Sequence, residues 1–158
     1  MARPSWDEYF IGIVKQVRQR GTCDRGRAGC IIVKDKRILT TGYAGPPPGM
    51  PHCDKVGHQM RTVIDELEHL SKHCVRTIHA EQNAIIQAAK YGISIDGAII
   101  YATMVPCYTC AKMLVAAGIK RAVCVKDYHA SQDTKKLFKQ AGLELIIKDV
   151  DIEKYSNQ

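Results

Sequence analysis

The 158-residue sequence lacks several features that would place it among membrane or secreted proteins. No run approaches the roughly 20 apolar residues of a membrane-spanning helix, and the first eight residues lack the apolar stretch of a signal peptide. There is no repeat, low-complexity tract or linker, and at roughly 100 to 150 residues per domain the chain has no room for a second catalytic module. We therefore expect a soluble, cytoplasmic protein with one domain over residues 1–158, frayed at 1–4 and 153–158.

The charge balance is basic, with 23 Lys and Arg against 16 Asp and Glu, for a formal net charge of +7. A positive charge of this size serves general solubility, or it serves an anionic ligand such as a nucleotide phosphate or a nucleic acid. The basic residues are spread along the chain rather than gathered in one tract, which argues against a nucleic-acid partner.

The seven cysteines call for an explanation, since a reducing compartment disfavours disulfides and leaves metal binding or catalysis as their use. Cys30 and Cys124 lie inside apolar runs, where a free thiol packs as a small hydrophobe. The five cysteines that remain to be explained are Cys23, Cys53, Cys74, Cys107 and Cys110.

Local patterns predict an α/β protein of order α-β-β-α-β-α-β-α-β. Helical periodicity, caps and stop signals predict helices over 5–19, 78–91, 106–117 and 131–140, and β-rich runs predict strands over 28–34, 37–43, 97–103, 120–126 and 143–148. A polar stretch over 59–73 is compatible with a helix. The first two strands should form an antiparallel hairpin, and the later strand–helix–strand alternation predicts parallel pairing. The result is a mixed sheet of about five strands covered by helices.

Two short motifs carry chemistry, and each opens a predicted helix. In Pro106-Cys107-Tyr108-Thr109-Cys110 the two thiols lie three residues apart and face the same way, in a first turn that favours thiolates. His79 would complete three ligands for zinc, leaving the fourth position for a water of pKa about 7. Glu81, two residues later, could take the proton of that water. A Cys-x-x-Cys alone could be a redox pair or half of a zinc finger, but the combination matches the zinc nucleobase deaminase signature.

With these motifs, the chain resembles the cytidine deaminase superfamily and, within it, the ComEB-type deoxycytidylate (dCMP) deaminases of bacteria and phages. The resemblance covers nearly the whole chain, including Ser5 to Phe10, Thr22-Cys23, Gly42-Tyr43, His73 to Ile85, Pro106 to Lys112 and Ala117 to Lys120. It implies a three-layer cytidine-deaminase-like fold and zinc-dependent hydrolysis of dCMP to dUMP and ammonia, a step toward dTMP. For a phage protein the location would be the host cytoplasm.

The resemblance also implies roles for single residues. Glu81 protonates N3 of cytosine and helps ammonia leave, while backbone N–H groups near Ala80 and Cys107 hold the base. Lys90 contacts the 5′-phosphate or is a solvated lysine at a helix end. Tyr128 and His129 match a loop near the nucleotide, as further substrate-binding candidates.

Ala44 departs from the family pattern, which usually has Asn at this position. In the family that Asn touches the sugar or the base, so this chain lacks one side-chain contact to the substrate. A deaminase of another nucleoside, base or tRNA adenosine is therefore a second reading of the sequence. A third is a non-catalytic, zinc-stabilised module that binds nucleic acid.

A second group of ligand types consists of Cys23, Cys53, His58, His73 and Cys74. Some phage relatives have an additional zinc at positions like Cys23 and Cys53, which suggests a closed site of Cys23, Cys53, His58 and Cys74. The alternative is a set of buried thiols with solvent-facing histidines.

By family analogy we expect a homohexamer, with dCTP as activator, dTTP as inhibitor and Mg²⁺ accompanying the nucleotide effector. Candidate effector-binding residues are Arg25, Arg27 and Tyr43, the last of these in the 42–49 loop.

Overall fold

The computed structural model describes residues 2–64 and 68–152. Its helices are α1 (Trp6–Val17), the 3₁₀ helix η1 (Arg18–Arg20), α2 (Cys53–Val56), α3 (Ala80–Tyr91), α4 (Tyr108–Ala116) and α5 (Gln132–Ala141). Its strands are β1 (Gly29–Lys34), β2 (Arg37–Tyr43), β3 (Met60–Ile64), β4 (Leu70–Cys74), β5 (Ile99–Met104), β6 (Arg121–Asp127) and β7 (Glu144–Ile152). The prediction of the main α/β order is confirmed.

Five strands form one mixed sheet in the order β2-β1-β5-β6-β7. Strand β1 pairs antiparallel with both β2 and β5, whereas β5, β6 and β7 run parallel, as the sequence predicts. The β1–β2 turn places Asp35 and Lys36 at φ values of 50° and 61°. Two successive residues with positive φ match the right-handed twist of a two-residue hairpin.

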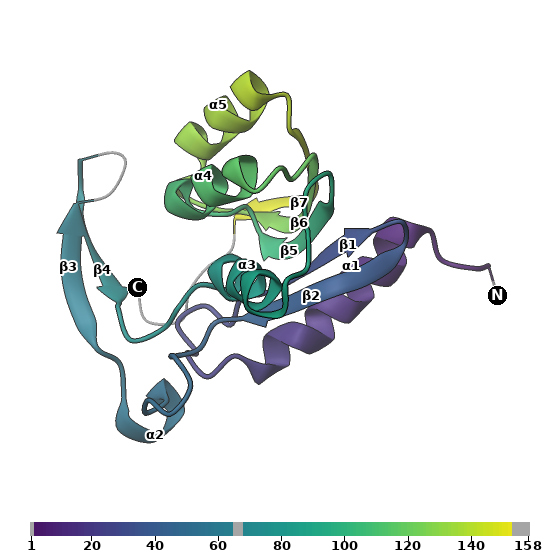
Figure 1. The fold of residues 1–158 in the computed structure, drawn as a ribbon. Helices are drawn as coiled ribbons and strands as arrows, with labels where there is room; N and C mark the ends of the chain where they lie inside the picture. Colours follow the sequence, from purple (N-terminus) through teal and green to yellow (C-terminus); the bar gives the residue numbers. More distant parts are fainter. Residues whose placement is uncertain (1, 65–67, 153–158) are drawn as a thin grey trace.

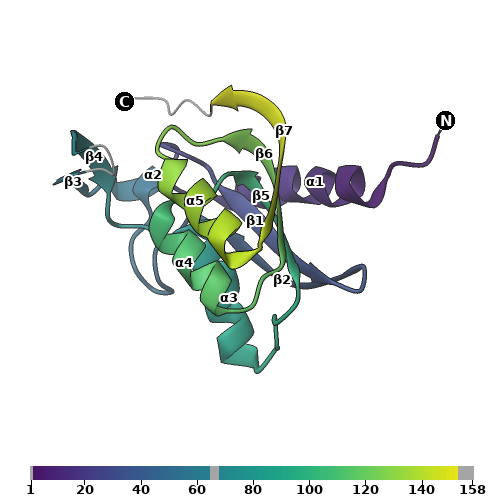
Figure 2. The same ribbon diagram turned by 90° about the horizontal axis from the view of Figure 1, so that it is seen from above.

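Helices cover both faces of this sheet, so the fold has the expected three layers (Figures 1 and 2). Helix α1 packs Phe10 and Val14 against Tyr101 on one face. Helices α3, α4 and α5 contribute to a larger apolar cluster on the other face, which contains Cys30 and Cys124. Both of these thiols are fully buried, as expected for core cysteines.

Helix α3 approaches the sheet unusually closely because its inward stripe is alanine. Ala80, Ala84 and Ala88 recur every four residues and are all buried. Gly42 of β2 makes the closest approach, since a Cβ there would lie 2.0 Å from the backbone oxygen of Ala80. The small side chains therefore fix the start of α3 against the end of β2.

The helix-compatible interpretation of residues 59–73 is wrong. The described part of this stretch is an antiparallel hairpin of β3 and β4, which stands away from the main sheet (Figure 1). Thr62, Val63 and Ile64 are β-branched and favour a strand. None of the residues of β3 and β4 is buried, so neither segment has the buried apolar stripe of a packed helix. The tail over 153–158, expected to fray, lies outside the described residues.

Within the described residues, no helix has the length and apolar character needed to cross a bilayer.

Candidate functional site

The two motifs both lie at helix starts, as predicted. His79 is the N-cap of α3 and Cys107 the N-cap of α4, both with extended backbone conformations. The backbone N–H of His79 donates to Oε1 of Gln82 at 3.0 Å, which holds the first turn of α3. Helix starts carry unpaired N–H groups and partial positive charge, so both motifs lie where anionic groups are stabilised.

The structure brings His79, Cys107 and Cys110 together. Nδ1 of His79 lies 3.5 Å from Sγ of Cys107 and 3.4 Å from Sγ of Cys110, and all three atoms lie within 4.8 Å of one another. Zinc bonds of about 2.3 Å to sulfur and about 2.1 Å to nitrogen, at tetrahedral angles, put such atoms about 3.6 Å apart. The donor set and the spacing therefore fit one zinc ion.

One thiol of this cluster, Cys107, is biased toward the thiolate form that binds metal. A hydrogen bond from Cys110 and the neighbouring His79 outweigh burial and lower the pKa of Cys107 to about 4. The same contact raises the pKa of Cys110, and the hydrogen bond to Cys107 raises that of His79 to about 9. The thiolate of Cys107 thus accepts hydrogen bonds from Cys110 and His79, and a bound cation would replace the protons of these two groups.

Glu81 lies beside this cluster as a buried carboxyl group, with 5% of its surface exposed. Burial raises its pKa, although the charge of His79 opposes the effect. A raised pKa brings a carboxyl group closer to the range in which it can both accept and return a proton. The pKa of Glu81 is therefore shifted in the direction that a general acid and base needs.

Glu81, His79 and Cys107 all line one cavity of about 450 Å³. This volume is typical of a site for one small ligand. Tyr128 and His129, expected near the nucleotide, also line the cavity, and their rings lie 4.4 Å apart between centroids. The three-ligand cluster therefore opens onto a space where a substrate could meet it.

Ala44, where the family usually has Asn, also lines this cavity, next to Ala28. Two alanines thus form this part of the wall, and neither offers a polar side-chain group. Any contact to the sugar or the base here must come from backbone atoms or from other residues.

Other predicted residues lie outside the cavity. Lys90 is exposed in the last turn of α3, over the ring of Tyr91, and nine residues past Glu81 put it about 13 Å away along the helix. The structure therefore does not bring Lys90 to the cavity. Ala80 is buried in the first turn of α3 and does not line it either. Of the effector candidates, Arg25 lines the cavity, whereas Arg27 and Tyr43 do not.

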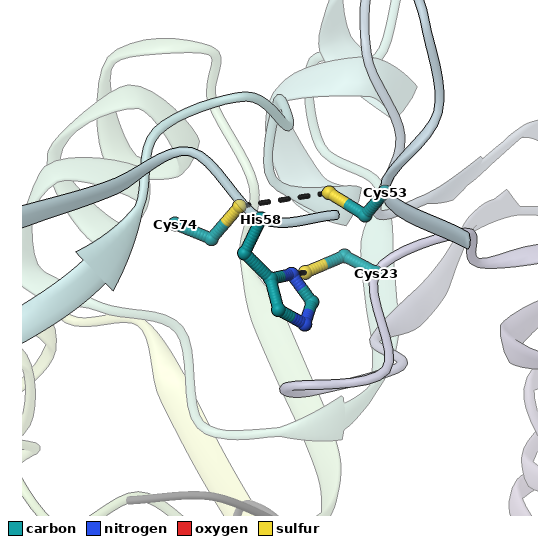
Figure 3. Close-up of side chains that lie close together, drawn as sticks. All are labelled: Cys23, Cys53, His58 and Cys74. Atoms are coloured by element: carbon teal, nitrogen blue, oxygen red, sulfur yellow. Dashed lines mark hydrogen bonds between the residues drawn. The ribbon is translucent and has the colours of Figure 1, made fainter. Parts of the chain in front are cut away.

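The second predicted cluster is also assembled. Ligand atoms of Cys23, Cys53, His58 and Cys74 lie within 4.8 Å of one another, and Figure 3 shows the four side chains converging. Sγ of Cys23 lies 3.6 Å from Nδ1 of His58, and Sγ of Cys53 lies 3.6 Å from that of Cys74. These spacings equal the ligand–ligand distances of tetrahedral zinc, and four protein donors would close its coordination.

Two further features of this second cluster suit a metal. Nε2 of His58 lies 2.9 Å from Oδ1 of Asp24, and metal-ligating imidazoles commonly donate their other N–H to a carboxylate. Hydrogen bonds from neighbouring groups outweigh burial and lower the pKa of Cys74 to about 7, whereas burial and Cys74 raise that of Cys53 to about 12. The cluster thus already holds one thiol close to its thiolate form.

Sequence reasoning missed the cavity wall that β4 provides. Ser71 and His73, two residues apart on this strand, line the cavity and contact each other through Oγ and Nε2 at 3.0 Å. Burial and the charges of His79, His129 and Arg25 lower the pKa of His73. The missing signal was the hairpin itself, since period-two spacing points to one face only once a strand is assigned.

Comparison with known proteins agrees with this geometry. Residues 4–126 match the model of the cytidine and deoxycytidylate deaminase zinc-binding region. The chain belongs to this family. It is 43% identical over 143 residues to ComE operon protein 2 of Bacillus subtilis (strain 168), covering 90% of this chain and 71% of the relative.

Two further members of the deaminase family extend the comparison. The deoxycytidylate deaminase of Mycobacterium phage D29 is 36% identical over 129 residues, which cover 80% of this chain and 99% of that protein. The crystal structure of dCMP deaminase from the cyanophage S-TIM5 in complex with dCMP and dUMP superposes with a TM-score of 0.73 at 28% identity, covering 93% and 99% of the two chains. The family fold is thus shared over nearly the whole chain, and the zinc-binding region over residues 4–126.

Proposed function

We propose that this chain is a zinc-dependent dCMP deaminase, which converts dCMP and water to dUMP and ammonia in pyrimidine nucleotide metabolism. One observation carries the proposal: the buried carboxyl group of Glu81 shares a cavity with a cluster of one imidazole and two thiols that has the spacing of three zinc ligands. The relatives named deoxycytidylate deaminase, and the solved dCMP deaminase bound to dCMP and dUMP, support this substrate.

In this proposal His79, Cys107 and Cys110 hold the zinc ion. When bound there, zinc supplies Lewis-acid activation of a water molecule. Glu81 accepts one proton of that water and delivers it to N3 of cytosine while the water oxygen bonds to C4; it then passes the second proton of the water to the 4-amino group, so that the C4–N bond breaks and ammonia leaves. The raised pKa of Glu81 suits both halves of this transfer.

Other residues orient the nucleotide. Tyr128 and His129 contact it from the loop after β6, where both line the cavity. The backbone N–H groups at the starts of α3 and α4, near Ala80 and Cys107, hold the base. Lys90, the expected phosphate contact, lies in the last turn of α3 and does not line the cavity of its own chain.

We further propose a second, structural zinc ion held by Cys23, Cys53, His58 and Cys74. Such an ion would stabilise the hairpin of β3 and β4, because an isolated two-stranded hairpin is only marginally stable in water. A closed four-ligand site would tie the end of β4 to the loop after η1 and to α2.

The remaining proposals concern organisation and regulation. We propose one deaminase domain over residues 1–158, a homo-oligomer of the hexameric type, and regulation by dCTP and dTTP with Mg²⁺. Light scattering coupled to gel filtration measures the mass of the assembly, and dCMP turnover with and without dCTP, dTTP and Mg²⁺ measures the regulation.

A substrate panel tests the proposed function. The purified, zinc-loaded protein is incubated with dCMP, deoxycytidine, CMP, cytidine, guanine and a tRNA anticodon stem-loop, and product and ammonia are quantified by chromatography. We expect dUMP from dCMP, with a kcat/KM at least about 100-fold above that for deoxycytidine, since contacts to a charged phosphate add binding energy. Preference for another substrate, or no deamination of any, would overturn the proposal.

A further inference from the structure

We propose that Thr134 of α5 is a positioning residue for the zinc site: by holding the backbone carbonyl of Pro106, it sets the orientation of Cys107 and thereby how tightly the three-ligand cluster holds its metal. The inference rests on the proposed function, because it concerns how the metal ligands of that site are kept in place. Thr134 lies outside both motifs and outside the segments that carry the family resemblance.

Thr134 makes a buried contact with the segment that enters α4. Helices α4 and α5 lie side by side on one face of the sheet (Figure 2). Oγ1 of Thr134 donates to the backbone oxygen of Pro106 at 3.0 Å, and both residues are fully buried. A threonine within a helix can satisfy its hydroxyl on the carbonyl four residues earlier in its own helix. This hydroxyl instead reaches a residue 28 positions away, so it joins α5 to the start of α4.

The carbonyl of Pro106 controls the backbone of the next residue, Cys107. The peptide bond between them is trans and planar, so the N–H of Cys107 points opposite to that carbonyl and away from Thr134. Helix α4 does not use this carbonyl, because its own hydrogen bonds begin where the N–H of Ala111 donates to the oxygen of Cys107 at 2.9 Å. Thr134 therefore fixes a peptide plane that the helix itself leaves unpaired.

The orientation of this peptide plane matters for the position of the thiol. The preceding residue, Val105, is held by β6, since its N–H donates to the oxygen of Lys126 at 3.0 Å. With Thr134 holding Pro106, the chain is fixed at two successive residues before Cys107. A rotation of the plane would change φ of Cys107 and move its Sγ from its place 3.5 Å from Nδ1 of His79. Zinc bonds of about 2.3 Å to sulfur leave little room for such a shift.

Neighbouring residues of α5 hold the other side of the cavity. Ser131 and Lys135, three residues before and one after Thr134, both bind the carboxylate of Asp127, at 2.7 and 2.6 Å. The same carboxylate accepts the backbone N–H of Tyr128 at 2.8 Å. The start of α5 thus supports the metal side and the substrate side through different residues. Loss of the Thr134 contact should therefore affect metal binding and kcat, and leave KM nearly unchanged.

Zinc release and steady-state kinetics together test this inference. Thr134→Val removes the hydroxyl at similar volume, and Thr134→Ser keeps it. Thr40→Val is the matched control, because Thr40 is also buried and its hydroxyl has no hydrogen-bond partner among the described residues. Each zinc-loaded protein is mixed with a chromogenic chelator, and the release phase of the three-ligand cluster is the one that Cys107→Ser lacks. The kcat and KM for dCMP are measured on the same preparations at saturating zinc.

We expect Thr134→Val to release zinc from this cluster about tenfold faster than the wild type and to lose about tenfold in kcat, because partners that orient metal ligands typically contribute about 10- to 100-fold. The KM for dCMP should change by less than about threefold, since the loop of Tyr128 keeps its contact to Asp127. Thr134→Ser and Thr40→Val should stay within about twofold of the wild type in all three quantities.

Several results would overturn the inference. Unchanged zinc release in a folded Thr134→Val would do so, as would a rise in KM alone or a loss that Thr134→Ser shares. If circular dichroism shows that Thr134→Val does not fold, Thr134→Ala is compared with Thr134→Ser, and equal zinc release from these two would refute the role of the hydroxyl. The proposed function fails separately, by absence of dCMP turnover in a wild type that holds its zinc.

Discussion

The imidazole of His58 lies between Cys23 and Asp24, with Nδ1 3.6 Å from the thiol and Nε2 2.9 Å from the carboxylate. With Nε2 directed to the carboxylate of Asp24, Nδ1 is the ring nitrogen that faces the thiol of Cys23 and is placed to bind a metal. The same pattern of one ring nitrogen toward a thiol and the other toward a carboxylate is common where histidine binds zinc. The second cluster is therefore expected to bind zinc, and the zinc content of the purified protein tests this expectation.

The first prediction concerns zinc stoichiometry. We expect the purified wild type to contain two zinc ions per chain by inductively coupled plasma mass spectrometry, and Cys74→Ser to contain one. Cys124→Ala, which removes a core thiol that belongs to neither cluster, should keep both ions. One zinc ion in the wild type, or two in Cys74→Ser, would exclude the structural site.

The second prediction concerns Asp127, which shapes the loop that carries Tyr128 and His129. Its carboxylate accepts hydrogen bonds from the backbone of Tyr128 at 2.8 Å and from Ser131 at 2.7 Å, and pairs with Lys135 at 2.6 Å. Asp127→Asn should raise the KM for dCMP about tenfold and change kcat less, because the loop positions the substrate.

Asp133→Asn is the control for this measurement. Asp133 forms an exposed ion pair with Lys136 at 3.6 Å in the same region, and pairs of this kind contribute little. Its steady-state parameters should match those of the wild type. Equal effects of the two substitutions, or a loss in kcat alone at Asp127, would contradict a positioning role.

The third prediction concerns stability in acid. Burial raises the pKa of Asp7, but hydrogen bonds from Arg121 and Tyr101 outweigh it, so the pKa lies below its ordinary value of 3.8. A carboxylate with a depressed pKa stabilises the fold above its unfolded pKa, and this contribution is lost as the pH falls through the folded value. We therefore expect Asp7→Asn to cost about 2 kcal/mol at pH 7 and progressively less below pH about 4.

Urea unfolding across this pH range measures the effect. Glu144→Gln is the control, since Glu144 pairs with the same Arg121 at 2.9 Å but its side chain is 61% exposed. Its substitution should cost less than about 1 kcal/mol at any pH. A cost for Asp7→Asn that does not shrink in acid would show that its charge is not what stabilises α1 on the sheet.

The sequence predicted most of the fold because its main elements bury apolar faces. Five strands form the common sheet, and four helices pack on it: α1, α3, α4 and α5. Their apolar residues therefore recur with the period of a strand or a helix, and this periodicity can be recognised in the sequence. The β3–β4 hairpin escaped this reasoning because none of the residues of its two strands is buried, so no apolar periodicity marks them.

The site was predictable to the same degree. His79, Glu81, Cys107 and Cys110 lie in short motifs at helix starts, where spacing translates directly into geometry, and the structure gathers them. Lys90 was assigned from the resemblance to the family, and it does not line the cavity because it lies in the last turn of α3, nine residues past Glu81. Ser71 was not singled out in the sequence and His73 only as a possible metal ligand, because their shared face on β4 is evident only once the hairpin is assigned.

The most direct test of the account is the comparison of zinc content and dUMP formation in Glu81→Gln and Cys107→Ser. Glu81 is assigned to proton transfer and Cys107 to metal binding, so the two substitutions should separate. We expect Glu81→Gln to keep the zinc content of the wild type and lose at least about a thousandfold in kcat, and Cys107→Ser to lose one zinc ion together with activity. Near-normal turnover in Glu81→Gln, or full zinc content in Cys107→Ser, would contradict the account.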